Sequence, residues 1–160
     1  MVTTTDISIQ NIREILEQVS DPEIPVLTIA DLGIIRDVKL HGDEVEVIIT
    51  PTYTGCPAMD MIAMNIKLAL IENGYHKIKI TSVLAPAWTT DWMTDAGKTK
   101  LKQYGIAAPD KKFPIPVDGV ECPLCNSTNT RLISEFGSTA CKALYQCNDC
   151  KEPFDFFKCH

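Results

Sequence analysis

The sequence lacks the features of several protein classes. It has no apolar run near the roughly 18 residues that a membrane-spanning helix needs, and its first segment, MVTTTDISIQ, lacks the basic and then apolar layout of a signal peptide. Excess positive charge is missing as well. The formal net charge is -6, whereas a nucleic-acid-binding surface needs clustered lysine and arginine to replace phosphate counterions. We therefore expect a cytoplasmic protein with no membrane and no nucleic-acid partner.

Internal repeats and low-complexity tracts are also absent, and the 45% of apolar residues indicates a folded chain. A length of 160 residues allows one ordinary domain, or one modest domain with a small appendage. Cysteine is distributed unevenly, because six of the seven cysteines lie between Cys122 and Cys159. In a chain without an export signal, such clustering indicates metal ligation or thiol chemistry rather than a disulfide framework.

Hydrophobic periodicity and turn residues predict an α+β fold. We expect a compact two-layer α/β domain over residues 1–108, a proline-containing linker over residues 109–120 and a small cysteine-rich domain over residues 121–160. The first domain should have the order α-β-β-α-β-α, with helices over residues 9–20, 59–71 and 91–104 and strands over residues 34–40, 44–50 and 76–83. The turn His41-Gly42-Asp43 should join the first two strands into a hairpin.

Two CxxC pairs lie in the cysteine-rich segment. Cys122 and Cys125 form one pair, Cys147 and Cys150 form the other, and 21 residues separate them, which is close to the knuckle spacing of a zinc ribbon. Each pair can face one ion from a tight turn, so four thiolates complete a tetrahedral site. About forty residues bury too little apolar area to fold unaided, so a structural zinc ion would supply much of the folding free energy. An iron–sulfur cluster and free or redox-active thiols are the competing interpretations.

Three potential metal ligands are left over in the same segment. Cys141 has apolar neighbours, so a small buried thiol is its simplest interpretation. Cys159 and His160 form a flexible tail, a replacement ligand pair or part of a second site. All three stay open as additional metal ligands.

Cys56 stands apart from the other cysteines, just before the helix expected over residues 59–71. A thiol at a helix N-terminus meets unpaired backbone N–H groups and the positive end of the helix dipole. We therefore expect a lowered pKa and a role as a reactive thiol or a transient metal ligand. The alternative is a buried cysteine that only packs as a small hydrophobic residue. The acids Asp21 and Glu23 flank Pro22, where acids commonly form turns.

Three segments together carry a resemblance to a known family. They are Asp21-Pro22-Glu23-Ile24-Pro25, Asp31-Leu32-Gly33-Ile34-Ile35 and Thr54-Gly55-Cys56-Pro57. They resemble the small iron–sulfur cluster assembly domain of metal-sulfur carrier and targeting factors, which has an α/β fold. The resemblance implies that Cys56 acts in cluster assembly or transfer and binds an iron–sulfur cluster or iron transiently. It also implies a site role for the acid of the first segment, Asp21 or Glu23.

The whole chain resembles the PaaD-like family of accessory proteins of the phenylacetate-degradation system. The resemblance covers both expected domains and includes residues 85–92 and the ending Phe157-Lys158-Cys159-His160. It implies a maturation factor for an iron–sulfur or di-iron centre of phenylacetyl-CoA epoxidase, one that is not a catalyst on its own. The implied partners are the epoxidase components, above all the iron–sulfur reductase. The alternatives are a structural or electron-transfer subunit of the epoxidase and a scaffold that only bridges partners. The oligomeric state, a homo-oligomer included, stays open.

Overall fold

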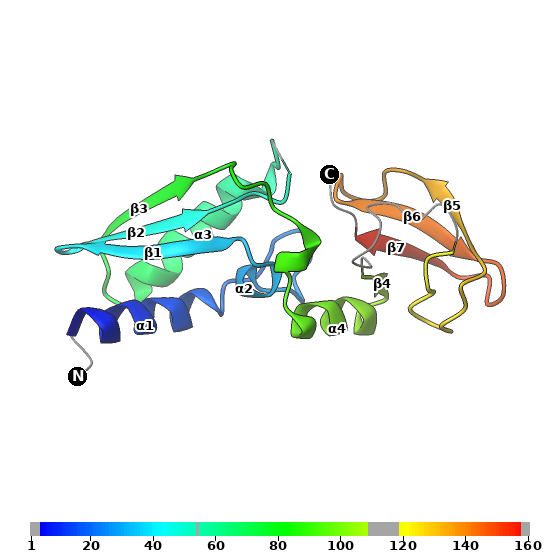
Figure 1. Cartoon of the computed structure of the whole chain (residues 1–160), viewed down its shortest axis with the longest axis horizontal. Helices are drawn as coiled ribbons and strands as arrows, with labels where there is room; N and C mark the ends of the chain where they lie inside the picture. The colour runs from blue at the N-terminus through cyan, green and yellow to red at the C-terminus, as the bar shows by residue number, and fades with distance from the viewer. Residues whose placement is uncertain (1–3, 54, 109–118, 158–160) are drawn as a thin grey trace.

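The structure is a computed structural model that describes residues 4–53, 55–108 and 119–157, with side chains from residue 8 onward. Within these residues the chain forms a three-stranded sheet and a four-stranded sheet, which lie side by side with the short helix α4 (Asp95–Gln103) between them (Figure 1). None of the described helices combines the length and the apolar character that crossing a membrane would require.

The first sheet buries one face beneath two helices. Its central strand β2 is antiparallel to β1 and parallel to β3. The strands are β1 (Ile35–His41), β2 (Glu44–Ile49) and β3 (Lys77–Ser82). Alternate residues of β2, Val45, Val47 and Ile49, are buried, as the two-residue period of a strand requires when one face is covered. The helices α1 (Thr4–Leu16) and α3 (Ala58–Glu72) cover that face and contact each other (Figure 1).

The second sheet is a ribbon with a small core of its own. Its strand order is β4-β7-β6-β5, with β6 antiparallel to both neighbours and β4 parallel to β7. The strands are β4 (Ile106–Ala107), β5 (Thr130–Ser134), β6 (Lys142–Cys147) and β7 (Pro153–Phe157). The rings of Tyr145, Phe154 and Phe156 stack or meet edge-on in its core. Because β4 comes from the chain just after α4, the first region supplies one edge of this sheet.

The two sheets also share a core. Cys141, just before β6, and Phe157, at the end of β7, are only 4% and 2% exposed and pack with the first sheet. The Phe157 ring stands edge-on to Trp88 with 6.0 Å between centroids, and the Trp88 indole N–H donates to the Leu32 carbonyl at 2.8 Å. Figure 1 shows that β6 begins and β7 ends on the side of the ribbon that faces the first sheet. The two regions therefore pack against each other.

The structure confirms the mixed α+β fold and the hairpin of β1 and β2. The helix expected over residues 91–104 is partly wrong, because Met93 is extended and buried and separates the turn η1 (Thr90–Trp92) from α4. Each of these elements has its own threonine cap, Thr89 and Thr94. The interruption at Met93 was not recognised from the local sequence.

Other boundaries differ at the ends of the expected elements. The first helix begins and ends earlier than expected, and Ser20, its expected last residue, pairs in a β-bridge with Thr28. The short helix α2 (Ile29–Leu32) and the strands β4 and β7 were not expected. They are short or lack a clear period, so long-range pairing decides them. Most of the linker expected over residues 109–120 lies outside the described residues.

Candidate functional site

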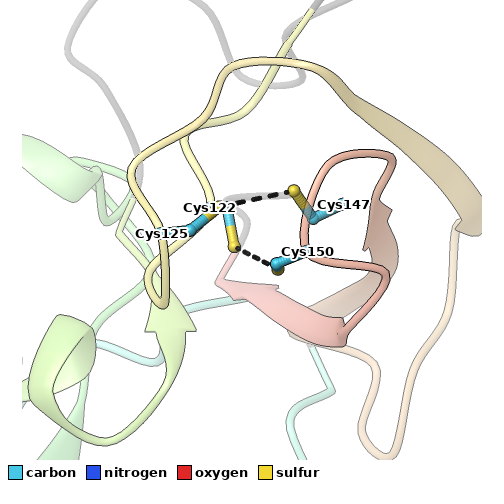
Figure 2. Close-up of side chains that lie close together, drawn as sticks. All are labelled: Cys122, Cys125, Cys147 and Cys150. Carbon is cyan, nitrogen blue, oxygen red and sulfur yellow. Dashed lines mark hydrogen bonds between the residues drawn. The ribbon is translucent and has the colours of Figure 1, made fainter.

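The four cysteines of the two CxxC pairs converge on one point beside the second sheet. Their Sγ atoms all lie within 4.8 Å of one another, with 3.8 Å between Cys122 and Cys150 and 3.6 Å between Cys125 and Cys147 (Figure 2). A tetrahedral ion with metal–sulfur bonds of about 2.3 Å needs sulfur–sulfur separations of about 3.8 Å. The donor set and its spacing therefore fit a single thiophilic metal ion.

Backbone turns of one kind aim both pairs of thiols. Asn126 and Lys151 each follow the second cysteine of a pair, and both have left-handed φ angles, 62° and 68°. In the first turn, the Asn126 N–H donates to the Cys122 carbonyl at 2.9 Å and the Cys122 N–H donates to the Ser127 carbonyl at 2.8 Å. The two pairs therefore approach the common point from equivalent knuckles.

Polar groups tie the two knuckles together. Asp149, between the cysteines of the second pair, accepts hydrogen bonds from the Ser127 hydroxyl and, at 3.0 Å, from the Asn129 amide. These two donors hold the pKa of Asp149 below its ordinary value. The backbone N–H of Cys150 bonds the Cys147 sulfur and lowers its pKa to about 7. The pKa values of Cys125 and Cys150 are raised instead, so the four thiols do not ionise alike in the absence of a metal ion.

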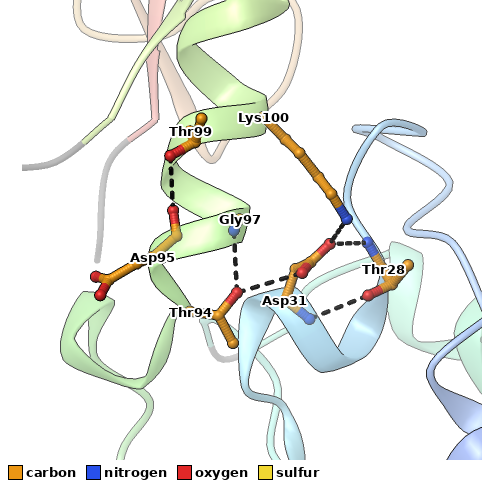
Figure 3. Close-up of polar contacts among 7 residues, drawn as sticks. All are labelled: Thr28, Asp31, Thr94, Asp95, Gly97, Thr99 and Lys100. Atoms are coloured by element: carbon orange, nitrogen blue, oxygen red, sulfur yellow. Dashed lines mark hydrogen bonds and ion pairs between the residues drawn. The ribbon is translucent and has the colours of Figure 1, made fainter.

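A second polar cluster, around Asp31, positions α4. At the start of α2 the Asp31 N–H donates to Thr28 Oγ1 and the Thr28 N–H donates to Asp31 Oδ2, each at 3.1 Å. The same carboxylate accepts hydrogen bonds from Thr94 Oγ1 at 3.2 Å and Lys100 Nζ at 2.6 Å (Figure 3). Burial opposes the ionisation of Asp31, but the donors outweigh it and lower the pKa. Asp31 therefore has a structural role, as the cap that joins α2 to α4.

Cys56 lies directly before α3, as the sequence predicts, with a half-buried side chain. The expected lowering of its pKa is wrong. Burial raises the pKa of the Cys56 thiol, and the charges of Glu23 and Asp21 raise it further. The Ala58 backbone N–H and the Tyr53 hydroxyl lower it, as a helix N-terminus should, but by less than burial raises it. Tertiary burial therefore overrides the local helix effect at this thiol.

Asp21 and Glu23 come to the same place as Cys56, from the turn after α1. Asp21 Oδ1 accepts the backbone N–H groups of Glu23 and Ile24, both at 2.8 Å, so this acid also forms the turn. Burial nevertheless raises the pKa of Asp21. The side chains of Asp21, Glu23 and Cys56 line one cavity of about 10 Å³. The structure thus brings these three candidate residues together.

The remaining ligand candidates fall elsewhere. Cys141 lies away from the four-cysteine cluster, and its Sγ donates to Glu23 Oε2 at 3.3 Å, within the lining of the Cys56 cavity. Cys159 and His160 lie outside the described residues. Of the three candidates, the one that the structure describes therefore lies with Cys56 rather than with the four-cysteine cluster.

Sequence reasoning did not single out two residues of this neighbourhood. The Tyr53 hydroxyl lowers the pKa of the Cys56 thiol, and Lys142, only 7% exposed, donates from Nζ to the Glu23 carbonyl at 3.4 Å. An isolated lysine at the start of an apolar strand, directly after Cys141, was the available signal for Lys142. The position of Tyr53 gave no signal, because its contact with Cys56 depends on the fold of the loop.

Comparison with known proteins divides the chain in the same way. Residues 9–75 match the family described as iron-sulfur cluster assembly protein, and residues 109–158 match the PaaD zinc beta ribbon domain. Among solved structures, a domain of unknown function from Bacillus anthracis is 27% identical with a TM-score of 0.57, covering 61% of this chain and 94% of its own. A conserved hypothetical protein from Thermotoga maritima, 23% identical with a TM-score of 0.51, covers 62% and 98% and shows the same fold.

Curated relatives extend the comparison. A Porphyromonas gingivalis protein named Fe-S protein maturation auxiliary factor is 34% identical over 94 residues, covering 58% of this chain and 89% of its own. A protein of Escherichia coli (strain K12), named as a subunit of 1,2-phenylacetyl-CoA epoxidase, is 47% identical over 162 residues, covering 99% of this chain and 98% of its own. Both halves of the sequence are thus matched in one relative, and the chain belongs to the PaaD family.

Proposed function

We propose that the chain is an accessory maturation factor that assists the assembly of an iron–sulfur or di-iron centre in the phenylacetyl-CoA epoxidase complex of phenylacetate catabolism. The observation that carries the proposal is the cavity shared by Cys56, Asp21 and Glu23, in the segment that matches the iron–sulfur cluster assembly family. Relatives named as Fe-S protein maturation auxiliary factors support a role in maturation. The full-length relative named as an epoxidase subunit supports the choice of client complex.

In this proposal Cys56 is a transient ligand of iron. Its thiol loses a proton when the iron–sulfur bond forms, and it regains a proton when a cysteine of the client replaces it on the iron. A raised pKa suits a temporary ligand, because the return of the proton to Cys56 favours release of the metal. The ribbon has the opposite property, because four converging thiols complete a closed tetrahedral site that suits a permanent ion.

We propose zinc as the ion of the ribbon, held by the four clustered cysteines. Zinc would supply a structural cross-link there, because four thiolates leave no open coordination position for a substrate. The ribbon then presents a fixed surface to the client. Large apolar side chains that support such a recognition surface are exposed on it: Leu124, Leu132, Ile133 and Phe136.

The direct test replaces Cys56 by serine and measures iron and acid-labile sulfide in the reductase component of the epoxidase, the first client to test, after co-expression. We expect loading to fall to the level seen without this chain. Met64→Ser is the matched control, because it removes a sulfur-containing side chain that is 59% exposed on α3, the helix that follows Cys56. Unchanged loading with Cys56→Ser would remove Cys56 from the mechanism.

An electron-transfer subunit is the second candidate, because four thiolates also suit an iron–sulfur cluster. Protein purified without oxygen separates the two functions. The maturation factor should be colourless with about one zinc per chain and no iron, whereas a redox subunit should be brown. A scaffold that only bridges partners predicts instead that chelation abolishes complex formation while alkylation of Cys56 has no effect.

A further inference from the structure

The cavity at Cys56 receives ligand groups from both sheets. Cys56 and Glu23 come from the first region, and Cys141 comes from the ribbon, 85 positions after Cys56 in the chain. The rest of the lining is mainly apolar, including Phe157 from the end of β7. Two thiols and a carboxylate therefore line one largely apolar cavity that exists only when the ribbon is packed on the first sheet. Among the described residues only the four ribbon thiols already converge as a ligand group, so an ion in this cavity would have to draw Cys56 toward Cys141 and Glu23.

Hydrogen bonds hold the two sides of this cavity together. Cys141 Sγ lies 3.3 Å from Glu23 Oε2 and 3.0 Å from Thr139 Oγ1. Lys142 Nζ reaches back to the Glu23 carbonyl at 3.4 Å and to the Ser138 hydroxyl at the same distance. The carboxylate of Glu23 thus already contacts Cys141, and Glu23 and Cys56 both line the cavity.

The size of the cavity limits what it can hold. Its volume is about 10 Å³, and about one water molecule needs roughly that space. A preassembled cluster of several iron and sulfide ions is far larger than a water molecule, whereas a single divalent metal ion is of similar size. The cavity therefore suits one ion.

The chemistry of the lining favours a cation. Asp21 and Glu23 supply carboxylate groups and Cys56 and Cys141 supply thiols, while the nearby Lys142 contacts the Glu23 carbonyl. Several acidic groups in one cavity are stabilised together when a divalent cation replaces their protons.

We propose that Cys56, Cys141 and Glu23 form a second metal site, between the two sheets, for a single thiophilic divalent cation of the ferrous-iron class. The inference deepens the proposed function and rests on it for the choice of iron, because two thiolates and a carboxylate also suit zinc or cobalt. When the ion binds, two metal–sulfur bonds form and two thiol protons leave to solvent, with no change in oxidation state. Release reverses these steps as thiolates of the client take the ion.

Cobalt titration of the full-length protein tests the site. The ribbon is first loaded with one zinc, and Co²⁺ is then added without oxygen, since its thiolate charge-transfer absorption reports bound sulfur. We expect the wild-type protein to bind a further equivalent of metal. Cys56→Ser and Cys141→Ser should each remove about half of the absorption and weaken binding by at least about tenfold. Met64→Ser should change neither, and the zinc content is measured after each titration.

Two results would overturn the site: no second equivalent in the wild-type protein, or an unchanged absorption band in a Cys141→Ser protein that keeps its zinc and its secondary structure. If Cys141→Ser does not fold, Glu23→Gln decides, because it keeps both thiols. It should keep the band and weaken binding by about tenfold, and unchanged affinity would contradict the proposal.

The iron content of the co-expressed client shows whether a failure concerns this metal site or the proposed maturation function. Loading that is lost with Cys56→Ser but retained with a folded Cys141→Ser protein removes Cys141 from the site and leaves the maturation function standing. Cobalt binding that depends on both thiols, together with normal loading in Cys56→Ser, supports the site and contradicts the maturation function.

Discussion

The two sheets differ in what stabilises each of them. The first covers one face with α1 and α3 and buries large aliphatic side chains, among them Leu16, Ile66 and Leu70, each with no exposed surface. The second packs a few aromatic rings beside four converging cysteines. Burial of apolar surface, at roughly 25 cal/mol per Å², can stabilise the first region by itself. A core as small as that of the ribbon needs a metal ion in addition.

The surroundings of the thiols differ as well. In the ribbon, four sulfurs converge on one point and backbone N–H groups point at them. In the first region, apolar side chains and two carboxylates surround the single thiol of Cys56. In our proposal the ribbon therefore holds its metal permanently, whereas Cys56 holds one temporarily.

The largest difference between the two regions is expected when the ribbon metal is removed. With a chelator, or with Cys147→Ser, the ribbon loses a contribution on the order of 10 kcal/mol and should unfold. The first sheet should keep its secondary structure, because its core is hydrophobic. Limited proteolysis followed by mass spectrometry should place new cuts within residues 119–157 and leave residues 8–53 protected. A ribbon that stays protected without metal would contradict the prediction.

A core truncation should have the converse effect. Ile66→Ala leaves a cavity in the first core, and it should lower the free energy of unfolding by about 2–5 kcal/mol while metal content stays unchanged. Urea denaturation gives the stability, and elemental analysis gives the metal content. Leu68→Ala is the control, because Leu68 is 51% exposed on the same helix and should change stability by less than about 0.5 kcal/mol. Loss of metal in Ile66→Ala would show that the two regions do not fold by separate means.

Two aspartates of the first region should respond to pH with opposite sign. The folded pKa of Asp31 lies below the ordinary value of 3.8, so its contribution is full above that pH and is lost as the pH falls through the folded pKa. The folded pKa of Asp21 lies above 3.8, so protonation favours folding, and that contribution is lost as the pH rises through the folded pKa.

The matching variants measure both effects by urea denaturation between pH 7 and about pH 3. At neutral pH, Asp31→Asn should lower the free energy of unfolding by roughly 1–2 kcal/mol, because it weakens a cap and an ion pair. Asp21→Asn keeps an oxygen that accepts the two backbone N–H groups, so it should leave stability equal or higher at neutral pH. A loss of stability in Asp21→Asn would mean that the charged form of Asp21 is favoured by folding.

The smallest effect is expected at an ion pair between α4 and the segment before the first knuckle. Lys102 Nζ lies 2.8 Å from Glu121 Oε1, with both side chains about half exposed. Because water and salt screen such a pair, Lys102→Ala should change stability by less than about 0.5 kcal/mol. Denaturation at low and high salt measures it, with Lys98→Ala on the same helix as the control. A larger loss would show that α4 transmits stability between the sheets.

The features that the sequence predicted correctly are those that depend on neighbouring residues in the chain. The hairpin of β1 and β2 followed from His41-Gly42-Asp43 between two apolar strands, and the convergence of four thiols followed from the CxxC spacing. The joining of the two regions did not follow. The strand β4 has two residues and no period of its own, and Cys141 had an adequate local interpretation as a buried thiol. At Cys56 the helix N-terminus does lower the pKa of the thiol, but burial raises it by more, and burial depends on the whole fold.

The edge contact between Phe157 and Trp88 has a consequence for biosynthesis. The ribosome makes the first sheet early, yet the apolar surface around Trp88 stays uncovered until β7 has emerged and docked. A nascent or truncated chain that stops before β7 would display this surface to chaperones and proteases. The last strand thus completes the core around Trp88, and a chain that lacks it would leave that core open.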